Sequence, residues 1–184
     1  MSDYFELLGL PRRFAVDLGE LERNYLGRSR AVHPDRLAGA ERSAEERSDA
    51  AGQAMEVNQA YRALRRELPR AEHLLSLEGV TIGDNQPVAP ALLAEMLELR
   101  EALEEARAAG DRGRLDQLER DARAGERAEL AELGARFSAL EAMAAGAPER
   151  AAALAAVVDQ VIRLRYLARY RDAFAEDDDV EGAA

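Results

Sequence analysis

The chain has 184 residues, of which 47% are hydrophobic and 5% aromatic, and its formal net charge is -11. This apolar content excludes a wholly disordered protein, and the negative charge argues against nucleic acid or an anionic membrane as the main partner. Without cysteine the chain has no disulfide framework and no thiolate metal site, and with only two histidines a histidine-based metal site would need carboxylates to complete it. We expect neither a metal nor a cofactor.

The residues that dominate the sequence are strong helix formers: alanine, leucine, glutamate and arginine. An all-α protein is therefore expected. The N-terminus lacks the basic start and apolar run of a signal peptide, and no apolar stretch approaches the ~20 residues that span a bilayer. These features predict a soluble, cytoplasmic protein.

The first 78 residues predict two antiparallel helices with a short helix packed across them. An apolar segment at 4–10 reads as two helical turns. Asp17, followed three residues later by Glu20, forms a capping box that opens the next helix. A second long helix follows, and Pro69 is expected to end or kink it.

A loop should separate these two helices. Pro34 disfavours helical backbone at the residue before it, so His33, Pro34 and Asp35 are expected outside both helices. An exposed loop held between two helices is a natural contact for a partner. The surrounding segment is also basic, within an otherwise acidic chain. Its arginines are Arg23, Arg28, Arg30 and Arg36.

Three segments of this region resemble a J-domain: DYFELLGL at residues 3–10, the His-Pro-Asp tripeptide at 33–35, and NQAYRAL at 58–64. The resemblance implies a domain that docks on a chaperone ATPase of the HscA/DnaK type and stimulates its ATP hydrolysis. In that family the tripeptide and basic residues of the preceding helix make the contact. The implied chaperone-binding residues are His33, Pro34, Asp35, Arg30, Arg28, Arg23 and Arg36.

Residues 79–90 contain two glycines and two prolines, which break the helical pattern and predict a linker. Three antiparallel helices are expected beyond it, forming a three-helix bundle over residues 91–175. The last segment, residues 176–184, predicts a disordered acidic tail.

The first helix of this bundle carries more apolar surface than one core face requires. At 100° per residue, its core stripe comprises Leu92, Met96, Leu99 and Leu103. Leu93 and Leu97 lie well off that stripe, beside a ladder of glutamates. The ladder consists of Glu98, Glu101 and Glu105. Leucines flanked by acids favour a partner-binding surface, although packing against the linker or the first domain is an alternative.

Residues 70–75 (RAEHLL) and 96–101 (MLELRE), together with the two-domain length, are similar to HscB-type co-chaperones of iron-sulfur cluster assembly. The family delivers an IscU-type scaffold protein to an HscA-type chaperone. Ala94 stands where the family often has a larger apolar residue, so that contact should be weaker. The scaffold-binding residues implied by the resemblance are Leu93, Leu97, Glu98, Glu101, Glu105 and Tyr166.

We therefore expect a non-enzymatic co-chaperone with a J-domain and a scaffold-binding bundle. One alternative is a J-domain protein that recruits a different client, and another is a helical adaptor without chaperone contact. An enzyme that uses His33 and Asp35 for acid-base chemistry is a third alternative, but no activated nucleophile or metal cluster accompanies this pair.

Overall fold

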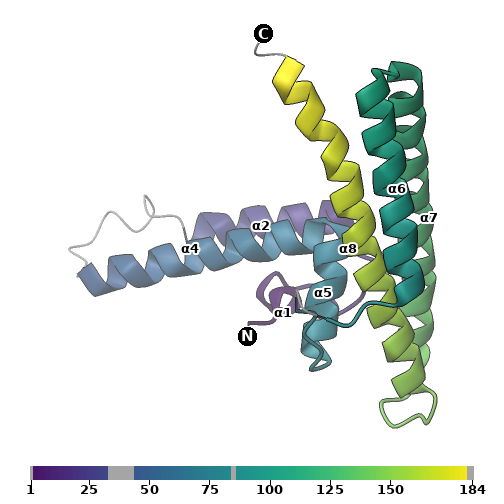
Figure 1. Ribbon diagram of the computed structural model, residues 1–184. Helices are drawn as coiled ribbons and strands as arrows, with labels where there is room; N and C mark the ends of the chain where they lie inside the picture. Colours follow the sequence, from purple (N-terminus) through teal and green to yellow (C-terminus); the bar gives the residue numbers. More distant parts are fainter. Residues whose placement is uncertain (1, 33–43, 84–85, 182–184) are drawn as a thin grey trace. The chain divides into compact units, whose positions relative to one another are not determined.

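The computed structural model describes residues 2–32, 44–83 and 86–181, and within these ranges every regular element is a helix (Figure 1). The all-α prediction is confirmed. The chain divides into two compact units, Met1–Thr81 and Ile82–Ala184. The helices are α1 (Tyr4–Leu7), α2 (Leu18–Ala31), α4 (Ala44–Arg65), α5 (Glu67–Leu77), α6 (Pro90–Ala109), α7 (Arg112–Ala142) and α8 (Arg150–Glu181).

Aspartates cap the first two helices. The Asp3 carboxylate accepts hydrogen bonds from the backbone N–H groups of the first turn of α1, and Asp17 does the same for α2. The bonds that Asp17 accepts from Glu20 and Gly19 lower its pKa, because they stabilise the ionised carboxylate. The segment predicted as two helical turns is only the four-residue α1, and Gly9, at a φ of 65°, turns the chain beyond it.

In the first unit α2 and α4 lie side by side and run antiparallel, and α1 packs against α4 (Figure 1). Tyr25 of α2 stacks on Tyr61 of α4 with 4.1 Å between ring centroids, and its hydroxyl donates a hydrogen bond of 2.7 Å to Asn58. The predicted helical hairpin with a short packing helix is confirmed. Its core contains Phe5, Leu8, Leu21, Val57, Ala60 and Leu64.

The second long helix of this unit ends earlier than Pro69 suggests. α4 ends at Arg65, and Arg66 is extended, with φ of -105° and ψ of 137°. Pro69 then lies in the first turn of α5, where its missing N–H leaves no bond unmade. In an unbroken helix the proline ring would clash with the carbonyl of Arg65, four residues earlier. The proline therefore interrupts the helix before its own position.

The second unit is the predicted three-helix bundle of α6, α7 and α8. Gly110, at a φ of 63°, ends α6, and the Asp111 carboxylate caps α7 by accepting a 2.9 Å bond from the N–H of Arg114. The α7–α8 interface contains buried apolar residues from both helices: Leu133, Phe137, Leu140, Val157, Val161 and Leu164. A second buried cluster joins α6 to both: Leu103, Ala106, Leu118, Ala122, Tyr170 and Phe174.

Helix α8 is longer than predicted. It continues to Glu181, into the segment from residue 176 onward for which the sequence predicts a disordered acidic tail. The sequence has no glycine or proline between Arg150 and Glu181, so it supplies no helix-breaking residue there. Within the described ranges, none of the helices combines the length and apolar content needed to cross a membrane.

Candidate functional site

The predicted chaperone-binding arginines of α2 are exposed: Arg23, Arg28 and Arg30. Arg23 and Arg30 are seven residues apart and share one side of the helix, away from the buried Leu21. Arg28 lies roughly 140° around the helix from Arg23, so the three do not form a single row. The remaining predicted residues lie outside the described part of the chain: His33, Pro34, Asp35 and Arg36.

One further residue on this side of α2, Leu26, was not among the predicted site residues. Leu26 is 44% exposed and lies three residues after Arg23 and four before Arg30, on the same side of the helix. The basic side of α2 therefore also presents an apolar side chain. A lone leucine in an otherwise polar stretch has no distinguishing sequence signal.

The predicted scaffold-binding residues on α6 are exposed. Leu93 and Leu97 are 48% and 57% exposed, as their position off the core stripe predicts. Within that stripe Leu92 and Leu103 are buried, but Met96 is only half-buried. The glutamates of the predicted ladder are exposed as well: Glu98, Glu101 and Glu105.

Leu93, Leu97 and Tyr166 line one groove of about 460 Å³ between α6 and α8. The three residues are far apart in sequence, and the bundle brings Tyr166 of α8 opposite the two leucines of α6. The glutamates of the ladder lie outside the groove lining. The other lining residues were not among the predicted site residues: Met96, Arg100, Leu103, Glu104, Arg107, Arg169, Tyr170 and Ala173. Met96 had been expected in the core.

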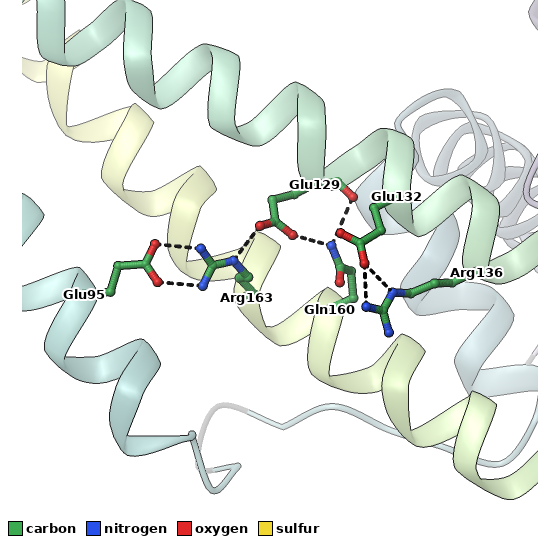
Figure 2. A network of polar contacts seen from close by, with 6 residues as sticks. All are labelled: Glu95, Glu129, Glu132, Arg136, Gln160 and Arg163. Atoms are coloured by element: carbon green, nitrogen blue, oxygen red, sulfur yellow. Dashed lines mark hydrogen bonds and ion pairs between the residues drawn. The ribbon is translucent and has the colours of Figure 1, made fainter.

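One guanidinium group links all three helices of the bundle (Figure 2). Arg163 of α8 donates to both oxygens of Glu95 on α6, at 2.7 and 2.6 Å, and to Glu129 on α7 at 2.7 Å. The bonds to Glu95 are the main reason that the pKa of Arg163 lies above its ordinary value. The buried Gln160 donates to the backbone carbonyl of Glu129 at 3.2 Å and also to its carboxylate. This network holds α6 against α8.

Arg107 joins the two walls at the other end of the groove. Its Nη2 donates to the carbonyl of Ala173 on α8 at 2.7 Å, and its Nη1 donates to Glu104 on α6 at 3.0 Å. Tyr170 and Phe174 pack edge to face beside it, with ring centroids 5.2 Å apart. Burial raises the pKa of the Tyr170 hydroxyl. The groove is thus fixed at both ends.

Across residues 2–32, 44–83 and 86–181, no three histidine, aspartate or glutamate side chains lie close enough together to hold a metal ion. The groove between α6 and α8 offers apolar contacts and charged groups. This is the chemistry of protein recognition.

Comparison with known proteins identifies the family. Residues 88–175 match the family model of the HSCB C-terminal oligomerisation domain. The solved structure of the chaperone HscB from Vibrio cholerae is 32% identical, with a TM-score of 0.78, covering 97% of this chain and 98% of that one. The chain belongs to the HscB family.

Other HscB proteins agree with this assignment. The co-chaperone protein HscB homolog of Azoarcus sp. (strain BH72) is 45% identical over 118 residues, which are 63% of this chain and 66% of the relative. The match thus spans just under two thirds of that curated relative. The human co-chaperone protein HscB is 23% identical, with a TM-score of 0.80 over 97% of this chain and 83% of the human one, and shows the same fold.

The matched HscB region contains the complete groove. Residues 88–175 include both leucines of α6 and Tyr166 of α8. The fold-level match to the V. cholerae protein extends over nearly the whole chain, including the helical hairpin of the first unit. The architecture of an HscB protein, a J-domain followed by a three-helix bundle, is therefore established for this chain.

Proposed function

We propose that this HscB-family chain binds an IscU-type scaffold protein of iron-sulfur cluster assembly and delivers it to an HscA/DnaK-type chaperone, whose ATP hydrolysis it stimulates. In this proposal residues 1–78 act as the J-domain, 79–90 as the linker and 91–175 as the scaffold-binding bundle. In this proposal, delivery of the scaffold to the chaperone takes place in the cytoplasm. The observation that supports the proposal is the groove in which Leu93 and Leu97 face Tyr166.

The groove has the apolar, aromatic and charged residues that protein–protein interfaces use. Two exposed leucines offer apolar area, and Tyr166 adds an aromatic surface. Because the tyrosine side chain has few rotatable bonds, it loses little conformational entropy when binding fixes it. The exposed glutamates along α6 give this surface an acidic margin that suits a basic rim on the scaffold. Such margins set orientation and association rate more than affinity.

The first unit would act on the chaperone without supplying a catalytic group. A partner can accelerate hydrolysis by binding the hydrolysis-competent state of the ATPase more tightly than the resting state. The exposed arginines of α2 suit an acidic docking surface on the chaperone, and His33, Pro34 and Asp35 would complete the contact. Because the client-binding bundle and the chaperone-binding domain belong to one chain, the effective concentration of the bound client at the chaperone is raised.

The scaffold contact is tested by replacing Leu93 and Leu97 with alanine together. Binding of the purified scaffold, measured by calorimetry, should weaken by about 2–3 kcal/mol, because both side chains are interface anchors. Leu18→Ala is the matched control, since Leu18 is a similarly exposed leucine of the other unit, at 51%. Equal binding by the double variant and the control would refute the scaffold assignment.

The chaperone contact is tested by His33→Gln. This variant should lose stimulation of the chaperone's phosphate release while it still binds the scaffold, since residue 33 belongs to the sequence of the first unit and not to that of the bundle. Arg30→Gln should give a partial loss, because it removes one exposed charge. Full stimulation by His33→Gln would contradict the docking assignment.

A further inference from the structure

The groove between α6 and α8 is basic, although the unit that contains it is acidic. Residues 79–184 hold 13 arginines and 22 acidic residues. The groove lining nevertheless includes three arginines and a single glutamate: Arg100, Arg107, Arg169 and Glu104. The local charge therefore has the opposite sign to that of the unit as a whole.

These arginines occupy different places in the groove. Arg107 bonds to Glu104 and to the carbonyl of Ala173, so it fastens the groove walls. Arg100 and Arg169 are exposed, one on each wall, and the Arg169 guanidinium lies 5.9 Å from the centroid of the Tyr166 ring. Two cationic side chains thus flank the apolar residues from opposite walls.

The acidic margin of α6 lies on the other side of the leucines. Taking 100° per residue, Arg100 lies roughly 20° from Leu93 toward the groove, whereas Glu101 and Glu105 lie about 80° and 120° from it in the opposite sense. Apart from Glu104, which pairs with Arg107 inside the groove, the surface therefore changes from basic to apolar to acidic around α6. A client segment can bind across this order of charges in only one orientation, because the reverse orientation would place its charges against like charges on α6.

From this order we infer that Arg100 and Arg169 recognise a carboxylate on the client. Resting on the proposed function, this inference specifies the client segment: it places an apolar side chain against Leu93 and Leu97 and an adjacent aspartate or glutamate in the groove. Guanidinium groups suit this role, because their planar forks match carboxylate geometry. The basic groove and the acidic margin together select the client and set its orientation.

The experiment compares Arg100→Gln, Arg169→Gln and the double variant in full-length protein, with the purified IscU-type scaffold as the probe. Each single change should weaken binding by about threefold, and both together by roughly tenfold, as expected for partly exposed ion pairs. The control is Arg127→Gln on α7, which removes the same charge from an exposed position that does not line the groove. Thermal melting checks that all variants are folded.

A second measurement identifies the carboxylate. The scaffold's exposed acidic residues are changed one at a time to their amides, and one change should cause the same loss with wild-type protein but no further loss with the double arginine variant. Such non-additivity would establish the ion pair directly.

The outcomes separate this inference from the proposed function. If Leu93→Ala with Leu97→Ala weakens scaffold binding while the double arginine variant binds as tightly as Arg127→Gln, the carboxylate inference is wrong and the scaffold site stands. Tighter binding by the arginine variants would also overturn the inference, because it would indicate a basic client segment. If wild-type protein does not bind the scaffold, the proposed function itself fails.

Discussion

Two buried polar side chains of α5 hold the N-terminal segment of the first unit. Arg70, 5% exposed, donates from Nε to the carbonyl of Leu64 at 2.8 Å and from Nη1 to the carbonyl of Phe14 at 2.5 Å. Its guanidinium also lies 5.4 Å from the centroid of the Phe14 ring. A single arginine thus ties the segment between α1 and α2 to the end of α4.

His73 fastens α1 in a similar way. The backbone N–H of Tyr4 donates to His73 Nε2 at 3.0 Å, and the Tyr4 ring stacks on the imidazole with 4.2 Å between centroids. Because Nε2 accepts this bond, the ring is neutral and carries its proton on Nδ1. Burial lowers the pKa of His73, and the charge of Asp3 only partly opposes this effect.

This geometry predicts a loss of stability in mild acid. The unfolded chain binds a proton at His73 near pH 6.5, whereas the folded chain resists protonation to a lower pH, so unfolding takes up a proton in between. The free energy of unfolding should therefore be highest above about pH 6.5 and fall as the pH drops toward the lowered pKa. Urea denaturation at several pH values between 7.5 and 5 measures this pH dependence of the free energy of unfolding.

His73→Gln provides the control, because glutamine can still accept from the Tyr4 N–H but does not titrate. The variant should be less stable at pH 7.5, having lost the ring stacking, and its stability should depend less on pH in this range. An unchanged pH dependence would assign the acid sensitivity to other groups. The sequence alone does not predict these contacts of His73, because its partners are a backbone N–H and an aromatic ring that are distant in sequence.

At the scale of the elements, the groove depends on how α6 is held against α8. Arg163 makes the connection, with its side chain 31% exposed and its partner Glu95 40% exposed. Replacing Arg163 with methionine should lower the free energy of unfolding by roughly 1–2 kcal/mol, allowing for solvent screening at this partly exposed site. It should also weaken scaffold binding, because the α6 wall loses its anchor.

Arg136→Met is the matched control. Arg136 pairs with Glu132 four residues earlier on α7, at 2.5 Å, so this ion pair lies within one helix (Figure 2). Its loss should cost about 0.5 kcal/mol or less. Arg163→Lys should recover only part of the loss, because an ammonium group cannot bond both oxygens of Glu95 and Glu129 at once. Equal effects at positions 136 and 163 would argue against the linking role.

Helical periodicity predicted the elements well where the pattern was regular. It placed Leu93 and Leu97 off the core of α6, and the capping box at Asp17 identified the start of α2. It did not place the break at Arg66, because the proline responsible lies three residues later. Met96 was assigned to the core because periodicity gives the direction of a side chain but not the width of the helix contact.

The candidate site was predictable only in part, for a physical reason. Exposed leucines on a helix are unusual enough to attract notice, whereas arginines are the ordinary content of a solvated face. Arg100 and Arg169 line the same groove only because α8 packs beside α6, although the two positions are nearly 70 residues apart in sequence. No local pattern encodes that proximity.

At the scale of the whole molecule, two activities are expected on one chain with a separate core in each unit. His33→Gln would keep scaffold binding, and the Leu93→Ala, Leu97→Ala variant would keep the chaperone contact. A mixture of these two variants should not restore the extra stimulation that scaffold gives with wild-type protein, because the advantage of joining both contacts is lost when they lie on different molecules. Phosphate release with chaperone and scaffold present measures this.

The control for that mixture is wild-type protein at half the total concentration, which should retain most of the scaffold-dependent stimulation. Full recovery by the mixture would mean that the scaffold and the J-domain reach the chaperone independently. The covalent connection between the two units would then have no role in delivery.

Helix α7 contributes none of the residues that line the groove. Because the sequence contains no cysteine, a thiol introduced at Arg127 would be unique in the chain. A fluorophore or a biosensor tether attached there would leave both groove walls uncovered. The back of the bundle is therefore the position from which client capture can be followed in real time without obstructing it.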